Sequence, residues 1–273
     1  KWFFHAFGNA DQTSRAIGNF LLPRDGWESV FLVFEDYAWG QSWKAGIEGR
    51  FEEHGTRLAG TGPASYGTSD YSSQISQAIN SDADAVIGAV VSATNFLKQA
   101  TQLGLREEKN LALGFFVLPY GKGVSQSELA GAWAPSKYYF LLQNDNNRNF
   151  VERYYNKYER LPTAASASSY KSMMELLKSY ESEGNNPESI TSYMEGREFT
   201  YFKGEPEYYR ECDHQLVQPI GVGRGYQERP DFSQFGMDVP DPTEYSLFET
   251  VGKAGGKSNP GLPACKDLAG SMD

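Results

Sequence analysis

Three kinds of residue in this sequence have the chemistry for catalysis: a pair of adjacent carboxylates, three histidines and a glycine-rich stretch. Glu35 and Asp36 follow an apolar run, and paired carboxylates are a common acid–base arrangement. Adjacent side chains on a chain usually diverge, however, and the helix dipole alone favours acidic residues at a helix N-terminus. We therefore predict helix capping for this pair. A hydrolase that uses Asp36 and His214 as an acid–base pair is the alternative.

The histidines and glycines carry no recognised catalytic signature. His5, His54 and His214 are scattered, and the sequence has neither a Cys-x-x-Cys nor a His-Glu-x-x-His spacing, so we expect no metal site. A Gly-x-Ser-x-Gly elbow and a phosphate-binding loop are also missing. Residues 221–226 (Gly-Val-Gly-Arg-Gly-Tyr) partly match the glycine-rich motif of dinucleotide-binding folds. The residues that follow lead to Pro230 and do not begin a helix, as that motif requires. We expect a protein that is not an enzyme and needs no cofactor.

Composition excludes two further classes of function. The chain has 273 residues, with 25 Lys and Arg against 35 Asp and Glu, which gives a net charge of −10. This acid excess, without a basic cluster, argues against nucleic-acid binding. The most apolar runs, residues 30–34 and 111–118, are far shorter than the roughly 20 residues of a membrane-spanning helix. The chain starts at Lys1 without a signal-peptide pattern, so we expect any signal peptide to have been removed or not included.

Cys212 and Cys265 are the two cysteines of the chain. An isolated pair favours one disulfide if the protein is exported, and closing a loop of this size is worth about 4 kcal/mol on a chain-entropy model. Two buried free thiols in a cytosolic protein are the alternative.

Short apolar runs alternate with longer amphipathic segments from Glu28 onward, which predicts an α/β fold with a parallel sheet. In the helix predicted at 37–53, every fourth residue from Trp39 is apolar and forms one buried face. The chain after Gln227 is rich in proline and glycine, and we expect it to wrap a surface without building a sheet. The predicted strands cover residues 29–34, 56–61, 84–91 and 111–117, and the predicted helices cover residues 37–53, 71–80, 92–103, 148–159 and 164–180.

Open α/β sheets bind ligands at the carboxyl ends of their parallel strands. Three loops fall at such ends, at residues 35–39, 90–94 and 116–120. They combine aromatic and apolar side chains with hydroxyl groups and with helix N-termini, whose free amides can hold a carboxylate. For each aromatic residue, an ordinary core or interface position is the alternative. The predicted ligand-binding residues are Tyr37, Trp39, Val91, Ser92, Phe116 and Tyr120.

Several short stretches occur in the order and spacing of one protein family. They are residues 34–42 (Phe-Glu-Asp-Tyr-Ala-Trp-Gly-Gln-Ser), 67–73, 83–86, 95–105, 149–154, 161–163, 169–170, 213–215 and 218–219. Together, from about residue 3 to 224, the sequence resembles type I periplasmic solute-binding proteins of branched-chain amino acid (Leu/Ile/Val) ABC transporters. The resemblance implies two α/β lobes, each a parallel sheet flanked by helices, that close by hinge motion on a small molecule and deliver it to a transporter permease.

The resemblance also implies how the chain divides. Residues 10–143 with 206–273 would form the C-terminal lobe, and residues 1–9 with 144–205 would be a remnant of the N-terminal lobe. The N-terminal third of the family pattern is lacking, so the N-terminal lobe would be incomplete in this chain. We expect a separate chain or an unrecorded segment to complete it.

The family pattern bears on the ligand. Trp39 occupies the place of an aromatic ligand contact, and residues 89–92 match a second contact loop. The acidic residue that normally pairs with a ligand ammonium group is replaced by the apolar stretch 115–118. This departure favours a small apolar, aromatic or carboxylate ligand. The alternatives are branched-chain amino acid binding and the ligand-sensing domain of a receptor or regulator. A periplasmic or extracellular location follows from the resemblance and favours the disulfide.

Overall fold

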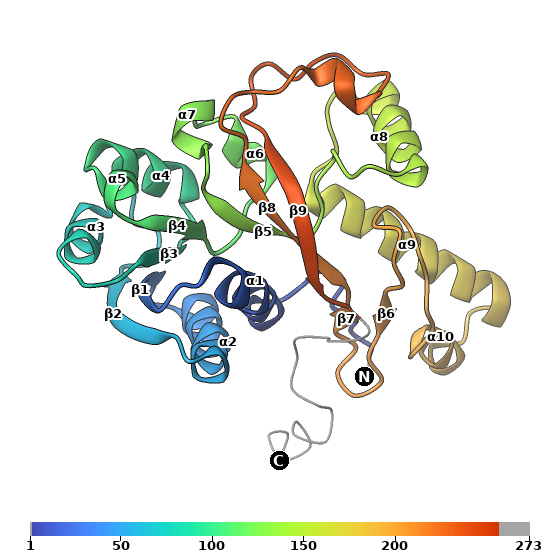
Figure 1. Cartoon of the computed structure of the whole chain (residues 1–273). Coiled ribbons are helices and arrows are strands. Elements are labelled where there is room, and N and C mark those ends of the chain that lie inside the picture. The colour runs from blue at the N-terminus through green and yellow to red at the C-terminus, as the bar shows by residue number, and fades with distance from the viewer. Residues whose placement is uncertain (1, 257–273) are drawn as a thin grey trace.

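The computed structural model describes residues 2–256, and its main feature is one seven-stranded sheet (Figure 1). The first five strands in spatial order run parallel, and the last two are antiparallel to their neighbours. The carboxyl ends of the five parallel strands therefore share one edge. In spatial order the strands are β2 (Arg57–Ala64), β1 (Ser29–Glu35), β3 (Ala85–Ala89), β4 (Asn110–Leu113), β5 (Trp133–Ser136), β8 (Pro219–Gly225) and β9 (Phe248–Gly255).

Helices cover both faces of this sheet, which explains why every residue of β1 is buried. Val30, Leu32 and Phe34 pack against α1 (Ala10–Asp25) and α2 (Ala38–His54). Phe31 and Val33 point to the opposite face and join a second apolar cluster with α3 (Ser72–Ile79) and α4 (Ala93–Gln102). The alternation of side chains along a strand thus divides one continuous apolar run between two cores.

A second group of elements lies beside the sheet and contains three helices and a two-stranded ribbon (Figure 1). The helices are α8 (Asp145–Tyr158), α9 (Ala164–Glu183) and α10 (Pro187–Met194), and the ribbon pairs β6 (Tyr208–Tyr209) with β7 (Leu216–Val217). The short helices α5 (Leu105–Glu108), α6 (Leu118–Gly121), α7 (Gln126–Leu129) and η1 (Phe232–Phe235) lie in connections between other elements.

Three segments run between the sheet and this second group: residues 5–9, 137–144 and 210–218, the last of which includes strand β7. The first and third lie side by side, because the N–H of His5 donates to the carbonyl of His214 and the N–H of Leu216 donates to the carbonyl of His5. The second is held by the buried Asn147, whose amide donates to the carbonyls of Phe140 and Leu142. We call these three segments the crossing segments.

The predicted strands and helices are present, with shifted ends, but one prediction about the tail is wrong. Residues 248–255 do not merely wrap a surface: they form β9, which pairs with β8 along its length. The prolines 230, 240 and 242 all lie in the connection before β9, so they leave its ladder of hydrogen bonds intact. Cys265 lies outside the described residues, and the Cys212–Cys265 disulfide stays a prediction.

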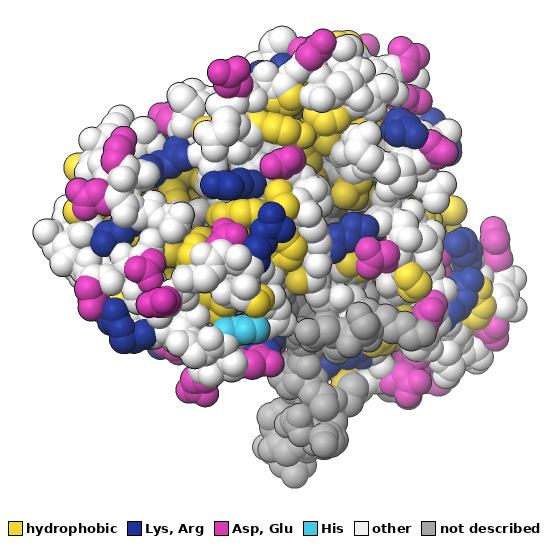
Figure 2. All heavy atoms as spheres, viewed as in Figure 1, with side chains coloured by type: hydrophobic (Ala, Val, Ile, Leu, Met, Phe, Trp, Pro, Cys, Tyr) yellow, Lys and Arg dark blue, Asp and Glu magenta, His cyan; other side chains and the backbone are white. Residues whose placement is uncertain are grey.

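The surface shows mixed charge. On the face drawn in Figure 2, Lys and Arg side chains are scattered among Asp and Glu side chains and form no continuous basic strip. Within residues 2–256, none of the helices combines the length and apolar character that a bilayer crossing requires.

Close packing of α1 against α2 depends on Gly46. A Cβ atom there would lie 2.1 Å from the Ser14 hydroxyl oxygen, whereas a Cβ atom at Gly49, on the same helix, would meet nothing within 4 Å.

We expect Gly46→Ala to lower the free energy of unfolding by about 1–3 kcal/mol, because the added methyl group overpacks this contact. The matched variant Gly49→Ala should raise it by about 1 kcal/mol, because alanine favours helix more than glycine does. Thermal and urea unfolding followed by circular dichroism measures both. Equal effects of the two substitutions would show that the α1–α2 contact is not tightly packed.

Candidate functional site

Glu35, at the carboxyl end of β1, organises the edge of the sheet where the predicted loops meet. Its carboxylate is fully buried. One oxygen accepts hydrogen bonds from the Tyr71 hydroxyl at 2.8 Å and from the N–H of Val91 at 2.9 Å, and the other accepts from the N–H of Gly67 at 3.4 Å. These donors come from the loops after β2 and β3, so a single carboxylate ties the end of β1 to two loops. Burial raises the pKa of Tyr71 above its ordinary value, and the hydrogen bond to Glu35 raises it further. The Tyr71 hydroxyl group therefore stays protonated and acts as a hydrogen-bond donor.

The predicted capping role of Glu35 and Asp36 is wrong. Tyr37 is the N-cap of α2 and makes no side-chain cap bond. Glu35 turns into the sheet edge, where three donors satisfy it, and Asp36 is exposed and accepts a hydrogen bond of 2.6 Å from the Gln41 amide. His214 bonds to Glu195 and to the carbonyl of Phe3 instead of pairing with Asp36. The geometry gives the hydrolase alternative no support.

Five aromatic rings form a continuous series along this edge, which we call the aromatic row. Successive ring centroids are 4.4 Å apart for Tyr66 and Tyr37, 6.1 Å for Tyr37 and Trp39, 5.4 Å for Trp39 and Phe115, and 5.5 Å for Phe115 and Tyr120. The rings come from the loops after β1, β2 and β4, and each remains at least partly exposed. Such a surface offers ring faces and edges to an apolar or aromatic ligand.

The Val91 peptide group links the aromatic row to Glu35. The Tyr120 hydroxyl donates to the Val91 carbonyl at 2.8 Å, and the Val91 N–H donates to Glu35. Burial, with a smaller contribution from the Glu35 charge, raises the pKa of Tyr120 to about 12, so this hydroxyl stays protonated at neutral pH. Ser92 follows as the N-cap of α4, and its hydroxyl makes no cap bond to that helix.

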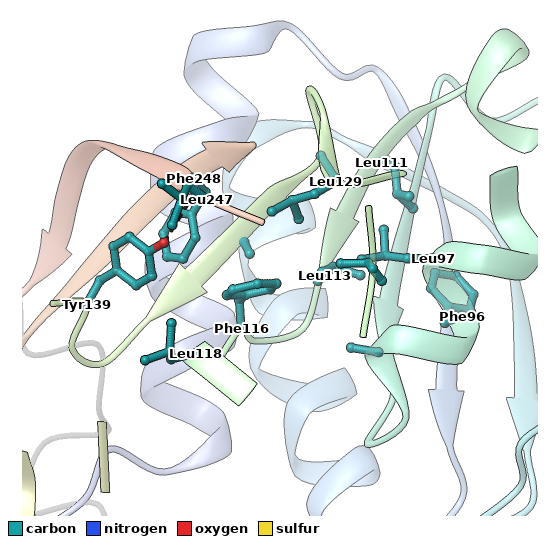
Figure 3. Packing of buried hydrophobic residues seen from close by; sticks show 14 of the residues in the cluster. Phe96, Leu97, Leu111, Leu113, Phe116, Leu118, Leu129, Tyr139, Leu247 and Phe248 are labelled. Atoms are coloured by element: carbon teal, nitrogen blue, oxygen red, sulfur yellow. Dashed lines mark hydrogen bonds between the residues drawn. The ribbon is translucent and has the colours of Figure 1, made fainter. Parts of the chain in front are cut away.

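The structure brings five of the six predicted residues to this edge with some exposure: Tyr37, Trp39, Val91, Ser92 and Tyr120. Phe116 is the exception, because its side chain is 1% exposed and packs against Phe248 in the core (Figure 3). Its neighbour Phe115, which the sequence analysis did not select, lies in the aromatic row instead. Two adjacent phenylalanines at a strand end point in different directions, and the sequence does not tell which one faces outward.

Among residues 2–256, no group of three or more His, Cys, Asp or Glu side chains is arranged to hold a metal ion. The edge offers aromatic faces, backbone groups and hydroxyl groups, which suits binding of an organic molecule.

We expect Glu35→Gln to lower the free energy of unfolding by about 1–3 kcal/mol, because the amide nitrogen would face donors where the carboxylate accepts. Asp36→Asn is the matched control on the next, exposed residue and should change stability by less than about 0.5 kcal/mol. Urea unfolding of both variants makes the comparison. If the two substitutions cost the same, Glu35 does not hold the loops together.

Solved structures of similar fold come from bacterial binding proteins. A periplasmic binding protein of Burkholderia mallei superposes with a TM-score of 0.79 at 18% identity, covering 95% of this chain and 66% of that protein. A branched-chain amino acid ABC transporter periplasmic ligand-binding protein of Burkholderia xenovorans gives 0.81 at 20% identity, with 97% and 68% covered. A solute-binding protein of an ABC transporter from Rhodopseudomonas palustris, in complex with 3,4-dihydroxybenzoic acid, gives 0.78 at 17% identity, with 94% and 68% covered.

These proteins establish the type I periplasmic-binding-protein fold that the sequence resemblance predicted, and the chain spans about two thirds of their length. Comparison with curated protein sequences gives no match. The family model described as periplasmic binding protein matches residues 1–228, which is most of the chain. On this match the chain belongs to the periplasmic binding protein family.

Proposed function

We propose that this chain is the solute-binding component of an ABC importer, acting in the periplasm or outside the cell, and that it closes by hinge motion on a small apolar, aromatic or carboxylate ligand. The aromatic row carries this proposal, because it gathers partly exposed rings at the carboxyl edge of a parallel sheet. The crossing segments supply the hinge, and a transporter permease is the partner that receives the ligand.

The distribution of charge at the edge supports an aromatic or apolar ligand over a free α-amino acid. An amino acid brings an ammonium group, which needs a carboxylate partner. Glu35 is buried and already accepts three hydrogen bonds, and Asp36 is engaged by Gln41. The Rhodopseudomonas palustris neighbour was crystallised with an aromatic acid. Branched-chain amino acid binding is the second candidate, because the Burkholderia xenovorans neighbour is named as a protein of a branched-chain amino acid transporter.

We also propose that residues 10–143 with 206–273 act as one lobe, that residues 1–9 with 144–205 belong to a second, and that further polypeptide completes the second lobe. Within residues 2–256, the β6–β7 ribbon is the only sheet in the group that contains α8–α10. A groove of about 1310 Å³ runs along α8 and α9, and apolar side chains stand exposed on these helices. They are Tyr158, Tyr170, Met173, Leu176, Leu177 and Tyr180. An uncovered apolar surface of this kind marks a contact with another part of the protein or with a partner.

Ligand binding tests the function directly. We expect 3,4-dihydroxybenzoic acid to bind the 273-residue chain and leucine to bind more weakly, measured by isothermal titration calorimetry and by the shift in melting temperature. Trp39→Ala should weaken binding about tenfold or more, which is about 1.4 kcal/mol, because the ligand loses a ring from the aromatic row. Leu103→Ala, at an exposed site away from the row, is the control. Tight leucine binding without binding of the aromatic acid would reverse the ligand assignment.

Mass analysis of the protein isolated from its source tests the second lobe. We expect a mass above the 30.4 kDa of this chain. An excess under denaturing conditions would place the missing part in the same polypeptide, and an excess only under native conditions would place it in a separate chain. A single species of 30.4 kDa under both conditions would contradict the proposal.

A further inference from the structure

Two buried lysines share one buried carboxylate beside the crossing segments. The Glu207 carboxylate accepts a hydrogen bond of 2.7 Å from Lys171 of α9, and the Lys203 ammonium group lies 3.3 Å from it. Within residues 2–256, neither ammonium group has another carboxylate partner. Since Lys171 makes the shorter contact, the charge of Lys203 is the one without a carboxylate of its own. We call Lys171, Lys203 and Glu207 the lysine cluster.

Lys203 joins the second group of elements to the sheet. Its ammonium group donates to the Pro219 carbonyl at 2.8 Å and to the Gln218 side-chain oxygen, which also accepts from Lys171. Pro219 is the first residue of β8. The Lys203 carbonyl in turn accepts a hydrogen bond of 2.8 Å from the Lys253 side chain of β9. One residue therefore holds α9 and two strands of the sheet in a single contact, which we call the junction.

The two sides of the junction differ in packing. On one side, a Cβ atom at Gly8 would lie 3.2 Å from Gln218 Nε2 and 3.3 Å from Lys137 Cε, so the first two crossing segments close tightly over Gln218. On the other side, Lys203 lines a cavity of about 440 Å³ together with the exposed Gly204. Water and protons therefore have a route to Lys203 from the surface.

Burial disfavours a second positive charge in the lysine cluster. It lowers the pKa of Lys203 to about 7; the attraction of Glu207 opposes this effect, and the charge of Lys171 adds to it. Burial acts to raise the pKa of Glu207, but the charges of Lys203 and Lys171 lower it overall, so the carboxylate stays ionised. Near neutral pH the cluster therefore passes between no net charge, with Lys203 neutral, and a net positive charge.

Other titratable groups face Lys203 from the surrounding elements. Lys253 is paired with Glu205 at 2.8 Å. Lys137 lines a small cavity next to Lys203, and burial lowers its pKa to about 8; below that pH its charge makes a charged Lys203 less favourable. The exposed Glu249 lines the larger cavity, where solvent screens its charge. Three tyrosines line the two cavities and stay neutral, because burial raises the pKa of each: Tyr138, Tyr139 and Tyr226.

We infer that the lysine cluster is a proton-dependent switch at the hinge. With Lys203 neutral, the cluster holds the start of β8 against α9. With Lys203 charged, the added positive charge is stabilised by water, so the junction loosens toward the cavity. Acidic conditions therefore favour an open hinge and weaker retention of the ligand. This last consequence rests on the proposed function, whereas the switch itself does not.

The pH dependence of stability tests the switch on the full 273-residue chain. Because the pKa of Lys203 is lower in the folded chain than in the unfolded chain, stability should rise as the pH rises above about 7. We expect the unfolding equilibrium constant, measured with urea, to fall about tenfold or more between about pH 7 and 8.5. The fall should be at least about fivefold smaller in Lys203→Met. Lys122→Met, at an exposed lysine, is the control and should keep the wild-type fall.

Hydrogen exchange, corrected for the intrinsic effect of pH, reports on the junction itself. Backbone amides of residues 203–220 should be protected about fivefold more at about pH 8.5 than at about pH 6.5, and those of β1 should change less. Lys203→Arg cannot lose its charge, so its junction should show low protection at both pH values. Lys203→Met should show high protection at both.

Carbon-13 NMR of the labelled wild-type chain follows the proton without any substitution. One lysine Cε signal should titrate near pH 7, where exposed lysines stay charged. The inference is wrong if every lysine stays charged up to about pH 9, or if Lys203→Arg and Lys203→Met protect the junction equally. None of these measurements uses a ligand, so the switch and the proposed ligand class fail separately.

Discussion

The buried carboxylate of Glu35 is the interaction on which the binding edge depends. A fully buried charge is costly unless donors surround it, and here the donors are a hydroxyl group and two backbone N–H groups from separate loops. The loops after β2 and β3 must therefore close over the end of β1, because only then do their donors reach the buried carboxylate. The same constraint orients the Val91 peptide group, to which Tyr120 binds from the loop after β4.

This arrangement separates rigidity from ligand contact. Glu35 and the Tyr71 hydroxyl are buried and occupied, so they hold the edge in shape, whereas the rings of the aromatic row remain partly exposed. Phe115 and Phe116 show the same division between neighbouring residues, since one ring joins the row and the other packs into the core beneath it (Figure 3). A ligand on the row would rest on side chains that the core already fixes, which reduces the entropy lost on binding.

The crossing segments carry a different kind of polar group. Around Glu35 every donor and acceptor is paired, but around Gly8 the buried amide nitrogen of Gln218 and the buried amide oxygen of Gln12 lack hydrogen-bond partners among the described residues, and the Lys137 ammonium group faces the Phe7 ring. Unpaired buried polar groups of this kind lower the stability of the fold.

The sequence by itself determined the parallel α/β core. The apolar run of β1 and the four-residue spacing of Trp43, Ile47 and Phe51 on α2 reflect burial that any such fold requires, and both are present as predicted. The family resemblance also held, because order and spacing of short stretches survive where overall identity is low. The apolar pattern of the sequence did not predict helix α1. That helix buries the polar residues Gln12, Thr13 and Ser14, so it lacks a clear apolar stripe.

Only the tertiary structure decided which polar and aromatic residues can act. Glu35 looked like half of a capping pair until the loops after β2 and β3 supplied its donors, and Phe116 looked like a site residue until its packing against Phe248 placed it in the core. The strand β9 likewise depends on pairing with β8, and no local sequence pattern predicts this pairing. The cluster at Gly8 joins residues more than 200 positions apart in the chain. Local periodicity specifies which face of an element is buried, but contacts between distant segments decide what surrounds each side chain, and with it the chemistry that side chain can perform.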